Sequence, residues 1–193
     1  MDIKKSQAEA FEFKIKTIEA ERLTLRKAEK NDAQGMFDNW ASDPEVTKFL
    51  PWQPHENVEV SKIIINSWIK GYEKNMLDLI IYHKKDKKII GSIGLIVRNA
   101  RLNILELGYC MARAYWGQGL MTEAAQAIVS FAFKESTANR IQARHDVDNP
   151  ASGKVMEKIG MIKEGVLRQS GLNNQGIRDM AVYSILREDY KKG

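Results

Sequence analysis

The stretch that decides the fold runs from residue 103 to residue 124 and reads NILELGYCMARAYWGQGLMTEA. Its alternating first part predicts a strand over 102–112, and apolar residues at helical spacing predict a helix over 118–134. Gly117 and Gly119 lie between the two. Glycine-rich backbone before a helix leaves several N–H groups pointing at one place, where the helix dipole adds partial positive charge. The loop is therefore either an anion-binding site or a sharp turn, and taken alone it is compatible with both.

Two common nucleotide-binding motifs do not fit this loop. The dinucleotide pattern G-x-G-x-x-G needs a glycine at position 122, where the chain has Thr122. The preceding strand also belongs to a meander rather than to a first strand–helix unit. The phosphate-loop pattern G-x-x-x-x-G-K-[ST] does not occur in the sequence. These mismatches speak against a nicotinamide dinucleotide or a nucleoside triphosphate as the ligand.

Outward from this stretch, strand and helix patterns continue along the chain. We expect further strands at 11–18, 22–28, 77–83, 88–97, 140–147, 161–171 and 177–189, and further helices at 31–40, 56–72 and 149–160. The last helix has both ends marked, by Asn149 as N-cap, Pro150 at the first helical position and Gly160 as the stop. This order predicts an α/β (α+β) fold with a mixed, mostly antiparallel central sheet of about seven strands flanked by helices. We expect a single domain over 1–193, with residues 1–10 as a polar, frayed extension.

The charge balance gives only mild guidance about partners. The 193 residues include 30 Lys and Arg against 25 Asp and Glu, a formal net charge of +5. The densest basic run, Lys84 to Lys88, is interrupted by Asp86 and is interpreted as a solvated hairpin tip. No RNA-binding motif accompanies it, so direct nucleic-acid binding is not expected.

The single cysteine and the scattered histidines exclude several classes of site. Cys110 has no partner for an intramolecular disulfide, which fits a reducing compartment. The three histidines lie far apart and none has zinc-ligand spacing, so we expect no metal. The N-terminus lacks the apolar core of a signal peptide, and no apolar run reaches the roughly 20 residues of a membrane span. We therefore expect a cytoplasmic protein that does not bind membranes.

Glu106 is the first candidate catalytic residue. In the strand over 102–112 it shares a face with Ile104, Gly108 and Cys110. A carboxylate beside small residues in the middle of a sheet indicates a pocket. The alternative is that Glu106 pairs with an arginine or lies at an exposed sheet edge, and the sequence leaves both open.

Taken together, these segments resemble the GNAT superfamily of acetyl-CoA-dependent N-acetyltransferases, and within it the ribosomal-protein N-terminal acetyltransferase (RimJ/RimL) type. The resemblance covers most of the chain, and the ordered set is more specific than any one piece. Its segments are ERLTLRKAEKNDA (21–33), FLPW (49–52), GSIGL (91–95), ELGYCMARAYWGQGLMTEA (106–124), DNPASGKVMEKIGMIKEGVLR (148–168) and RDMAVYSILRED (178–189).

The resemblance implies a site for acetyl-CoA. The family signature Q/R-x-x-G-x-G/A falls on residues 116–121, with Trp116 in place of the polar first residue and Met121 in place of the small last one. Backbone amides of this loop would hold the pyrophosphate of coenzyme A, and main-chain atoms of the preceding strand would pair with its pantetheine arm. The residues so implied are Gly117, Gln118, Gly119, Leu120, Met121 and Thr122 in the loop, and Cys110, Met111 and Ala112 in the strand.

The helix over 149–160 supplies the second candidate catalytic residue. Asn149 and Ser152 fit the N-x-x-S pattern of the subfamily, and both would contact the cofactor. Many relatives carry a tyrosine further along this helix as general acid, but here Met156 stands at that place. The resemblance implies that Ser152 protonates or hydrogen-bonds the coenzyme A sulfur instead. The alternative for Ser152 is ordinary capping of the helix N-terminus.

The expected reaction is direct attack of an amine on acetyl-CoA in a ternary complex, with Glu106 as general base. The acceptor is a protein N-terminus, such as that of a ribosomal protein, or a small amine such as a polyamine, aminoglycoside or amino acid. A non-catalytic acetyl-CoA-binding module is a further alternative. Trp52 and Phe49 resemble the loop beside the acceptor groove, or form a hydrophobic plug under the early helices. Since related enzymes are often dimers, the resemblance also allows a homodimer.

Overall fold

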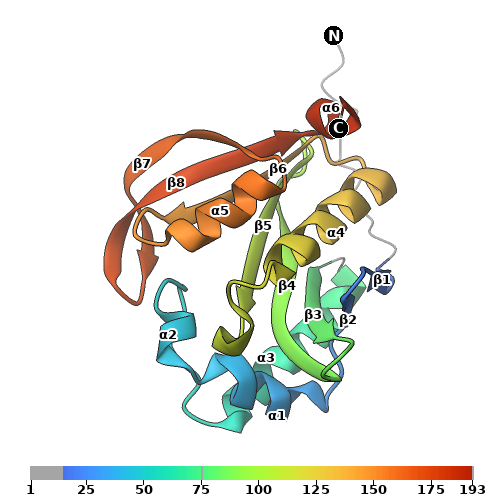
Figure 1. Cartoon of the computed structure of the whole chain (residues 1–193), viewed down its shortest axis with the longest axis vertical. Helices are drawn as coiled ribbons and strands as arrows, with labels where there is room; N and C mark the ends of the chain where they lie inside the picture. The colour runs from blue at the N-terminus through green and yellow to red at the C-terminus, as the bar shows by residue number, and fades with distance from the viewer. Residues whose placement is uncertain (1–14, 75, 193) are drawn as a thin grey trace.

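The computed structural model describes residues 15–74 and 76–192 and is built around one twisted sheet of eight strands (Figure 1). The strand order is β1-β2-β3-β4-β5-β6-β8-β7, with β5 and β6 parallel and the other described pairs antiparallel. The strands are β1 Ile18–Glu19, β2 Leu23–Lys27, β3 Leu77–His83, β4 Lys88–Asn99, β5 Ile104–Met111, β6 Arg140–Asp146, β7 Ile162–Asn173 and β8 Gly176–Leu186. The mixed, mostly antiparallel sheet is as predicted, with eight strands rather than about seven. The extension expected at 1–10 lies outside the described residues.

Helices cover both faces of this sheet (Figure 1). The helices α4 and α5 lie on one face, and α1 and α3 pack on the other against β3 and β4. The helices are α1 Asp32–Met36, α2 Pro44–Thr47, α3 Val58–Gly71, α4 Leu120–Glu135, α5 Pro150–Lys158 and α6 Arg187–Lys192. Within the described residues, no helix is long and apolar enough to cross a membrane.

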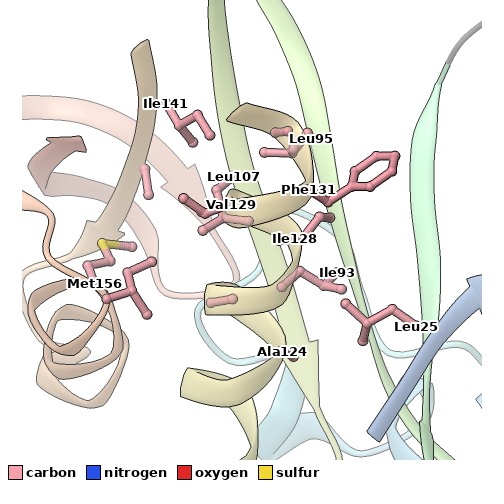
Figure 2. Close-up of a cluster of buried hydrophobic side chains, with 14 of the residues drawn as sticks. Leu25, Ile93, Leu95, Leu107, Ala124, Ile128, Val129, Phe131, Ile141 and Met156 are labelled. Atoms are coloured by element: carbon pink, nitrogen blue, oxygen red, sulfur yellow. The ribbon is translucent and has the colours of Figure 1, made fainter. Parts of the chain in front are cut away.

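The main core lies between α4 and the middle strands (Figure 2). The apolar stripe predicted for this helix is buried at Leu120, Ala124, Ile128 and Phe131, against Leu107 of β5 and its neighbours. Burying a large aliphatic or aromatic side chain contributes about 1.5–3 kcal/mol. The core therefore fixes α4, and with it the glycine loop at its N-terminus, against β5.

The ends of α5 follow the sequence closely. The Asn149 side chain accepts a hydrogen bond from the N–H of Ser152, and Pro150 occupies the first turn. Gly160 has φ +86° just past the helix, in the left-handed region that glycine adopts without strain. The capping signals therefore set the place of Ser152 at the first turn of α5.

The first helix differs from the expectation of one helix over 31–40. The α-helix ends at Met36 and continues as a π-helical segment, Phe37–Ala41, and the Asn31 side chain makes no capping bond. The Asp32 carboxylate is instead bound by the Arg26 guanidinium and by the N–H of Glu29. This tertiary ion pair anchors the start of the helix to β2.

Candidate functional site

The parallel pair β5–β6 comes apart in the middle of the sheet. The two strands pair only from Ile104 opposite Arg140 to Glu106 opposite Gln142, although β5 continues to Met111 and β6 to Asp146. Beyond Glu106 the side of β5 that faces β6 has no strand partner. This divergence leaves main-chain groups of β5 available to a ligand.

The register of β4 and β5 identifies those main-chain groups. Ala112 donates its N–H to the carbonyl of Ile90 on β4. Because successive residues of an antiparallel strand point their N–H and C=O to alternate sides, Tyr109 and Met111 point theirs into the divergence. The Met111 carbonyl accepts a bond from Trp116 Nε1 at 2.7 Å, so the group of Met111 that can bind a ligand is its N–H, which faces the divergence. The register favours Tyr109 and Met111 for main-chain contacts, because Cys110 and Ala112 face β4.

The glycine loop ends at the N-terminus of α4, next to the end of β5. Gly117 and Gly119 have φ +74° and +75°, in the left-handed region that favours glycine. No side chain caps this helix, and a Cβ built at Gly117 would meet nothing within 4 Å. The first amides of α4 therefore lack a side-chain partner on an open surface, which is the arrangement that binds anions.

Arg22 holds this loop, a role that the sequence reading did not assign. Its guanidinium donates to the Gln118 carbonyl at 3.0 Å and to the Glu123 carboxylate at 2.7 Å. The Glu123 carboxylate also accepts the Arg22 backbone N–H. These three hydrogen bonds of Arg22 join the start of β2 to the glycine loop and the first turn of α4. The only sequence signal for this role is the segment ERLTLR, where the resemblance to the family begins. That segment does not indicate which residues Arg22 contacts.

Met121, the residue that replaces a small one, packs on the main core. Its side chain therefore points toward the sheet side of α4. Thr122 follows it in the first turn of the helix and is half-buried.

Ser152 contacts β5 through Tyr109. The Tyr109 Oη lies 3.0 Å from both the Ser152 Oγ and the Ser152 carbonyl oxygen. Burial raises the pKa of Tyr109 to about 12, so the phenol keeps its proton. This tyrosine was assigned no role from the sequence. Ser152 is thus fixed from β5 as well as by its position at the start of α5.

Glu106 lies at the last paired position before the divergence, on the face opposite α4. Arg98 binds its carboxylate with two hydrogen bonds of 2.8 and 2.9 Å, and Gln142 adds one of 2.8 Å. Arg144 approaches to 3.2 Å. Burial opposes ionisation, but the bonds from Arg98 and Gln142 and the two guanidinium charges outweigh it, so the pKa of Glu106 is lowered. Glu106 is therefore paired with arginines, as the alternative from the sequence held. It also lies beside the divergence of β5 and β6.

Cys110 is a half-buried strand residue. Its Sγ lies 3.3 Å from the Ser92 Oγ, and burial raises the pKa of the thiol. A raised pKa disfavours the reactive thiolate.

Trp52 and Phe49 lie in the loop after α2. Trp52 packs partly against the cluster under α1 and α3, and its ring lies 5.3 Å from that of His55. The Lys48 ammonium lies over the Phe49 ring. This packing agrees with the plug interpretation of Trp52, and a place beside the acceptor groove stays a prediction for both residues.

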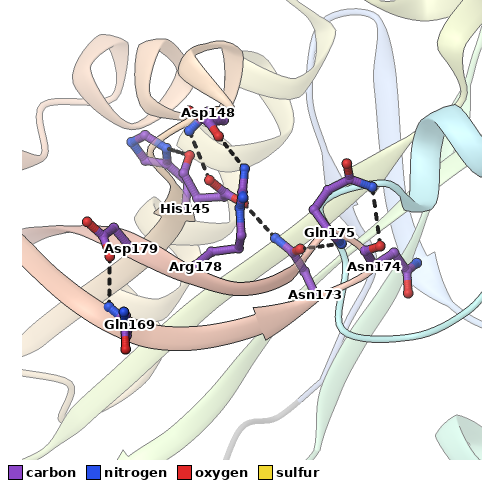
Figure 3. A network of polar contacts seen from close by, with 9 residues as sticks. His145, Asp148, Gln169, Asn173, Asn174, Gln175, Arg178 and Asp179 are labelled. Atoms are coloured by element: carbon purple, nitrogen blue, oxygen red, sulfur yellow. Dashed lines mark hydrogen bonds and ion pairs between the residues drawn. The ribbon is translucent and has the colours of Figure 1, made fainter.

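The turn between β7 and β8 clasps this loop. The Asn174 side chain donates to the carbonyls of Thr47 and Trp52 at 2.9 and 2.8 Å, and accepts a bond from Gln53. Behind the turn, Asn173 and Arg178 both bind Asp146 at the end of β6 (Figure 3). The end of β6, the hairpin turn and the loop around Trp52 are therefore held together, with Asp146 fully buried beneath them.

The structure thus brings together most of the expected cofactor residues. The glycine loop meets β5 through Trp116, and Ser152 meets it through Tyr109. Glu106 borders the same divergence from the opposite face, and Trp52 and Phe49 belong to the loop whose carbonyls Asn174 binds. The described part of the chain contains no group of three or more His, Cys, Asp or Glu side chains that could hold a metal ion.

Known proteins share both this sequence and this fold. Residues 22–162 match a family model described as an acetyltransferase (GNAT) domain. The uncharacterized N-acetyltransferase p20 of Bacillus licheniformis is 31% identical over 179 residues, which span 91% of this chain and 99% of that protein. A crystal structure of a GNAT-family acetyltransferase from Bacillus anthracis superposes with a TM-score of 0.79 at 28% identity, covering 90% of this chain and 99% of that one.

One relative has a named acceptor. The ribosomal protein uS5-alanine N-acetyltransferase of Escherichia coli is 24% identical over 190 residues, which cover 91% of this chain and 93% of that protein. The glycine loop, Glu106 and Ser152 all lie inside the residues matched by the family model.

Proposed function

Since the chain belongs to the GNAT acetyltransferase family, we propose that it transfers an acetyl group from acetyl-CoA to the N-terminal α-amine of a protein. The observation that carries the proposal is the divergence of β5 and β6, into which the N–H groups of Tyr109 and Met111 point. It lies beside the uncapped N-terminus of α4. A pantetheine arm pairs with an extended strand, and a pyrophosphate suits the amides at a helix N-terminus.

In this arrangement the two candidate catalytic residues lie on opposite sides of the sheet. Glu106 faces away from α4, whereas Ser152 stands at α5, on the α4 side. A thioester held in the divergence is therefore open to attack from the Glu106 side, and its sulfur can leave toward Ser152. The Met111 N–H is placed to polarise the thioester carbonyl.

The reaction needs one bond made and one broken. The amine lone pair forms the C–N bond, the C–S bond breaks, and its electron pair stays on the sulfur. The proton lost by the amine passes through water to the Glu106 carboxylate and on to solvent. Positioning of the two reactants in one complex supplies much of the rate.

The lowered pKa of Glu106 favours an acceptor that needs little help from a base. A carboxylate with a lowered pKa is a weak base at neutral pH. An α-amine, with a pKa of about 7.7–8.0, is already roughly a tenth neutral at pH 7, whereas a lysine amine near 10.4 is almost wholly protonated. The named acceptor of the Escherichia coli relative is of the first kind. These points support an α-amine acceptor, with a ribosomal protein as the first candidate.

A homodimer through the edge strand β7 belongs to the same proposal. This strand exposes Ile162, Val166 and Leu167, and its neighbour β8 exposes Ile177. An exposed apolar edge strand pairs readily with a second chain. Sedimentation at micromolar concentration tests the dimer, and a monomer under these conditions would remove it.

The proposed activity is tested with acetyl-CoA and a panel of N-terminal peptides, a lysine-only peptide with a blocked N-terminus, polyamines, aminoglycosides and amino acids. We expect free thiol release with peptides that carry a free α-amine, and acetylation of that amine by mass spectrometry. Release only with a small amine would assign the alternative acceptor. Binding of acetyl-CoA with no release for any acceptor would favour the non-catalytic module.

A further inference from the structure

The hydroxyl group of Tyr109 is positioned to control the hydroxyl group of Ser152. The Tyr109 Oη lies 3.0 Å from two oxygens of the same residue, the Ser152 Oγ and the Ser152 carbonyl oxygen. A phenol has one proton and donates to one acceptor at a time. Two arrangements of this pair are therefore available, and they differ in where the Ser152 proton points.

In the first arrangement the Tyr109 phenol donates to the Ser152 carbonyl, and the Ser152 hydroxyl donates to the Tyr109 Oη. The serine proton is then engaged, and only lone pairs of Oγ face outward. In the second arrangement the phenol donates to Oγ, which leaves the serine proton free to reach another acceptor. A sulfur anion beside Ser152 stabilises the second arrangement, because it offers that proton a charged acceptor.

We propose that Tyr109 is a positioning residue for departure of the coenzyme A thiolate and acts through Ser152. The inference rests on the proposed function. As the C–S bond breaks, the phenol donates to Oγ and the Ser152 hydroxyl donates to the sulfur. Hydrogen bonds in such a chain strengthen one another, so Ser152 becomes a better donor than it would be alone.

No proton needs to be transferred along this chain. Burial holds the pKa of Tyr109 at about 12, above that of a free thiol near 8.5, so the phenol keeps its proton while the thiolate is formed. The departing sulfur takes its proton later, from solvent. The geometry thus gives Ser152 a phenol partner from β5, in a chain whose α5 has Met156 where many relatives carry a tyrosine.

The test is a double-mutant cycle with Tyr109→Phe, Ser152→Ala and both changes together. Phenylalanine keeps the ring and removes only the hydroxyl. We expect Tyr109→Phe to lower kcat about three- to tenfold, as loss of one hydrogen bond does. The KM for acetyl-CoA should change less than about twofold, since the hydroxyl acts at the departing sulfur. In the Ser152→Ala background the same change should have no further effect on kcat.

Tyr183→Phe is the matched control, because the Tyr183 hydroxyl also joins a strand to α5, through Glu157. It should leave kcat unchanged. Independent, multiplicative effects of Tyr109→Phe and Ser152→Ala would overturn the inference while leaving the acetyltransferase intact. An unchanged kcat in Tyr109→Phe would overturn it too.

The proposed function fails by a different result, namely no transfer by the wild-type protein to any acceptor. Thermal melting of each variant checks folding. If Tyr109→Phe does not fold, Ser152→Thr serves instead. It keeps a hydroxyl for the phenol, so its kcat should exceed that of Ser152→Ala. An equal kcat in the two variants would overturn the inference.

Discussion

At Glu106, burial and ion pairing act on one carboxylate in opposite directions. Burial favours the neutral acid, and the hydrogen bonds from Arg98 and Gln142, with the charges of Arg144 and Arg98, favour the carboxylate. The second influence prevails, so this group is ionised throughout the neutral range. Any change of rate between pH 6 and pH 9 should therefore follow the acceptor amine and not Glu106.

Replacing Glu106 tests its role in the reaction. Glu106→Gln should lower kcat at least about tenfold, because the proposed proton acceptor is lost. The Kd for acetyl-CoA should stay within about twofold, since the side chain faces away from the α4 loop. The matched control is Glu164→Gln, which removes another arginine-paired carboxylate. Steady-state kinetics from pH 6 to pH 9 give the comparison, and unchanged turnover across that range would exclude Glu106 as the base.

The sequence predicted the roles of single residues where those roles depend on residues nearby in the chain. Asn149, Pro150 and Gly160 mark the ends of α5 because capping depends on neighbours in the chain. The arginines around Glu106 were not predictable, since they come from β4 and β6 and meet it only when the sheet forms. Tyr109 was missed for the same reason, because its partner lies 43 residues further along the chain.

At the scale of elements, the α4 N-terminus depends on backbone that only glycine adopts easily. Gly119→Ala places a Cβ on a residue with φ +75° and costs about 1–2 kcal/mol of folding stability. We also expect the Kd for acetyl-CoA to rise at least about tenfold, because the amides that we propose to bind the pyrophosphate would shift.

Gly160→Ala is the control for that change. Its φ of +86° imposes similar strain at the far end of α5. It should reduce the melting temperature to a similar degree and leave the Kd unchanged. Calorimetric titration with coenzyme A measures both variants, and equal loss of affinity in the two would mean that Gly119 acts through stability alone.

The strands beyond the divergence are held by an ion pair that spans three of them. Arg140 of β6 binds Glu164 of β7 at 2.5 and 2.6 Å, and Ser184 of β8 donates to the same carboxylate. The bond from Arg140 is the main cause that lowers the pKa of Glu164 to about 2. Because this pKa lies below its ordinary value, the stabilisation is present above about pH 4.5 and is lost as the pH falls toward 2.

This sign is open to measurement by thermal unfolding. Glu164→Gln should lower the melting temperature at pH 7, and the difference from wild type should shrink steadily below pH 4.5. Glu59→Gln removes an exposed pair with Lys62 within α3 and should change little at any pH. A difference for Glu164→Gln that stays constant from pH 7 to pH 2 would contradict the assignment.

At the scale of the whole molecule, Asn174 connects the β7–β8 turn to the loop that contains Trp52. Asn174→Ala removes the bonds to the carbonyls of Thr47 and Trp52. Because the resemblance implies that the Trp52 loop borders the acceptor groove, we expect the KM for the acceptor to rise about three- to tenfold, as loss of a hydrogen bond does, with the KM for acetyl-CoA unchanged. Gln175→Ala, in the same turn, is the control. If the KM for acetyl-CoA rises instead, the clasp serves the cofactor side.

The overall architecture was predictable because the order of strands and helices follows from periodicity. The strands β3 and β4 and the helices α3 and α4 begin and end within a few residues of their expected limits. The divergence of β5 from β6 was not predictable from the sequence, because hydrophobic alternation is the same in paired and unpaired strands. The resemblance implies that the strand at this divergence binds the pantetheine arm, and the register of β4 and β5 indicates that Tyr109 and Met111 make the contacts.

The central claim is that acetyl-CoA lies in this divergence with its pyrophosphate at the start of α4. Titration of the ¹⁵N-labelled protein with coenzyme A, followed by amide NMR, tests it most directly. The account predicts the largest shifts at the amides of Tyr109, Met111 and residues 117–122, with small shifts at Cys110 and Ala112. Saturable binding with its largest shifts elsewhere, and none at Met111 or residues 117–122, would contradict the account.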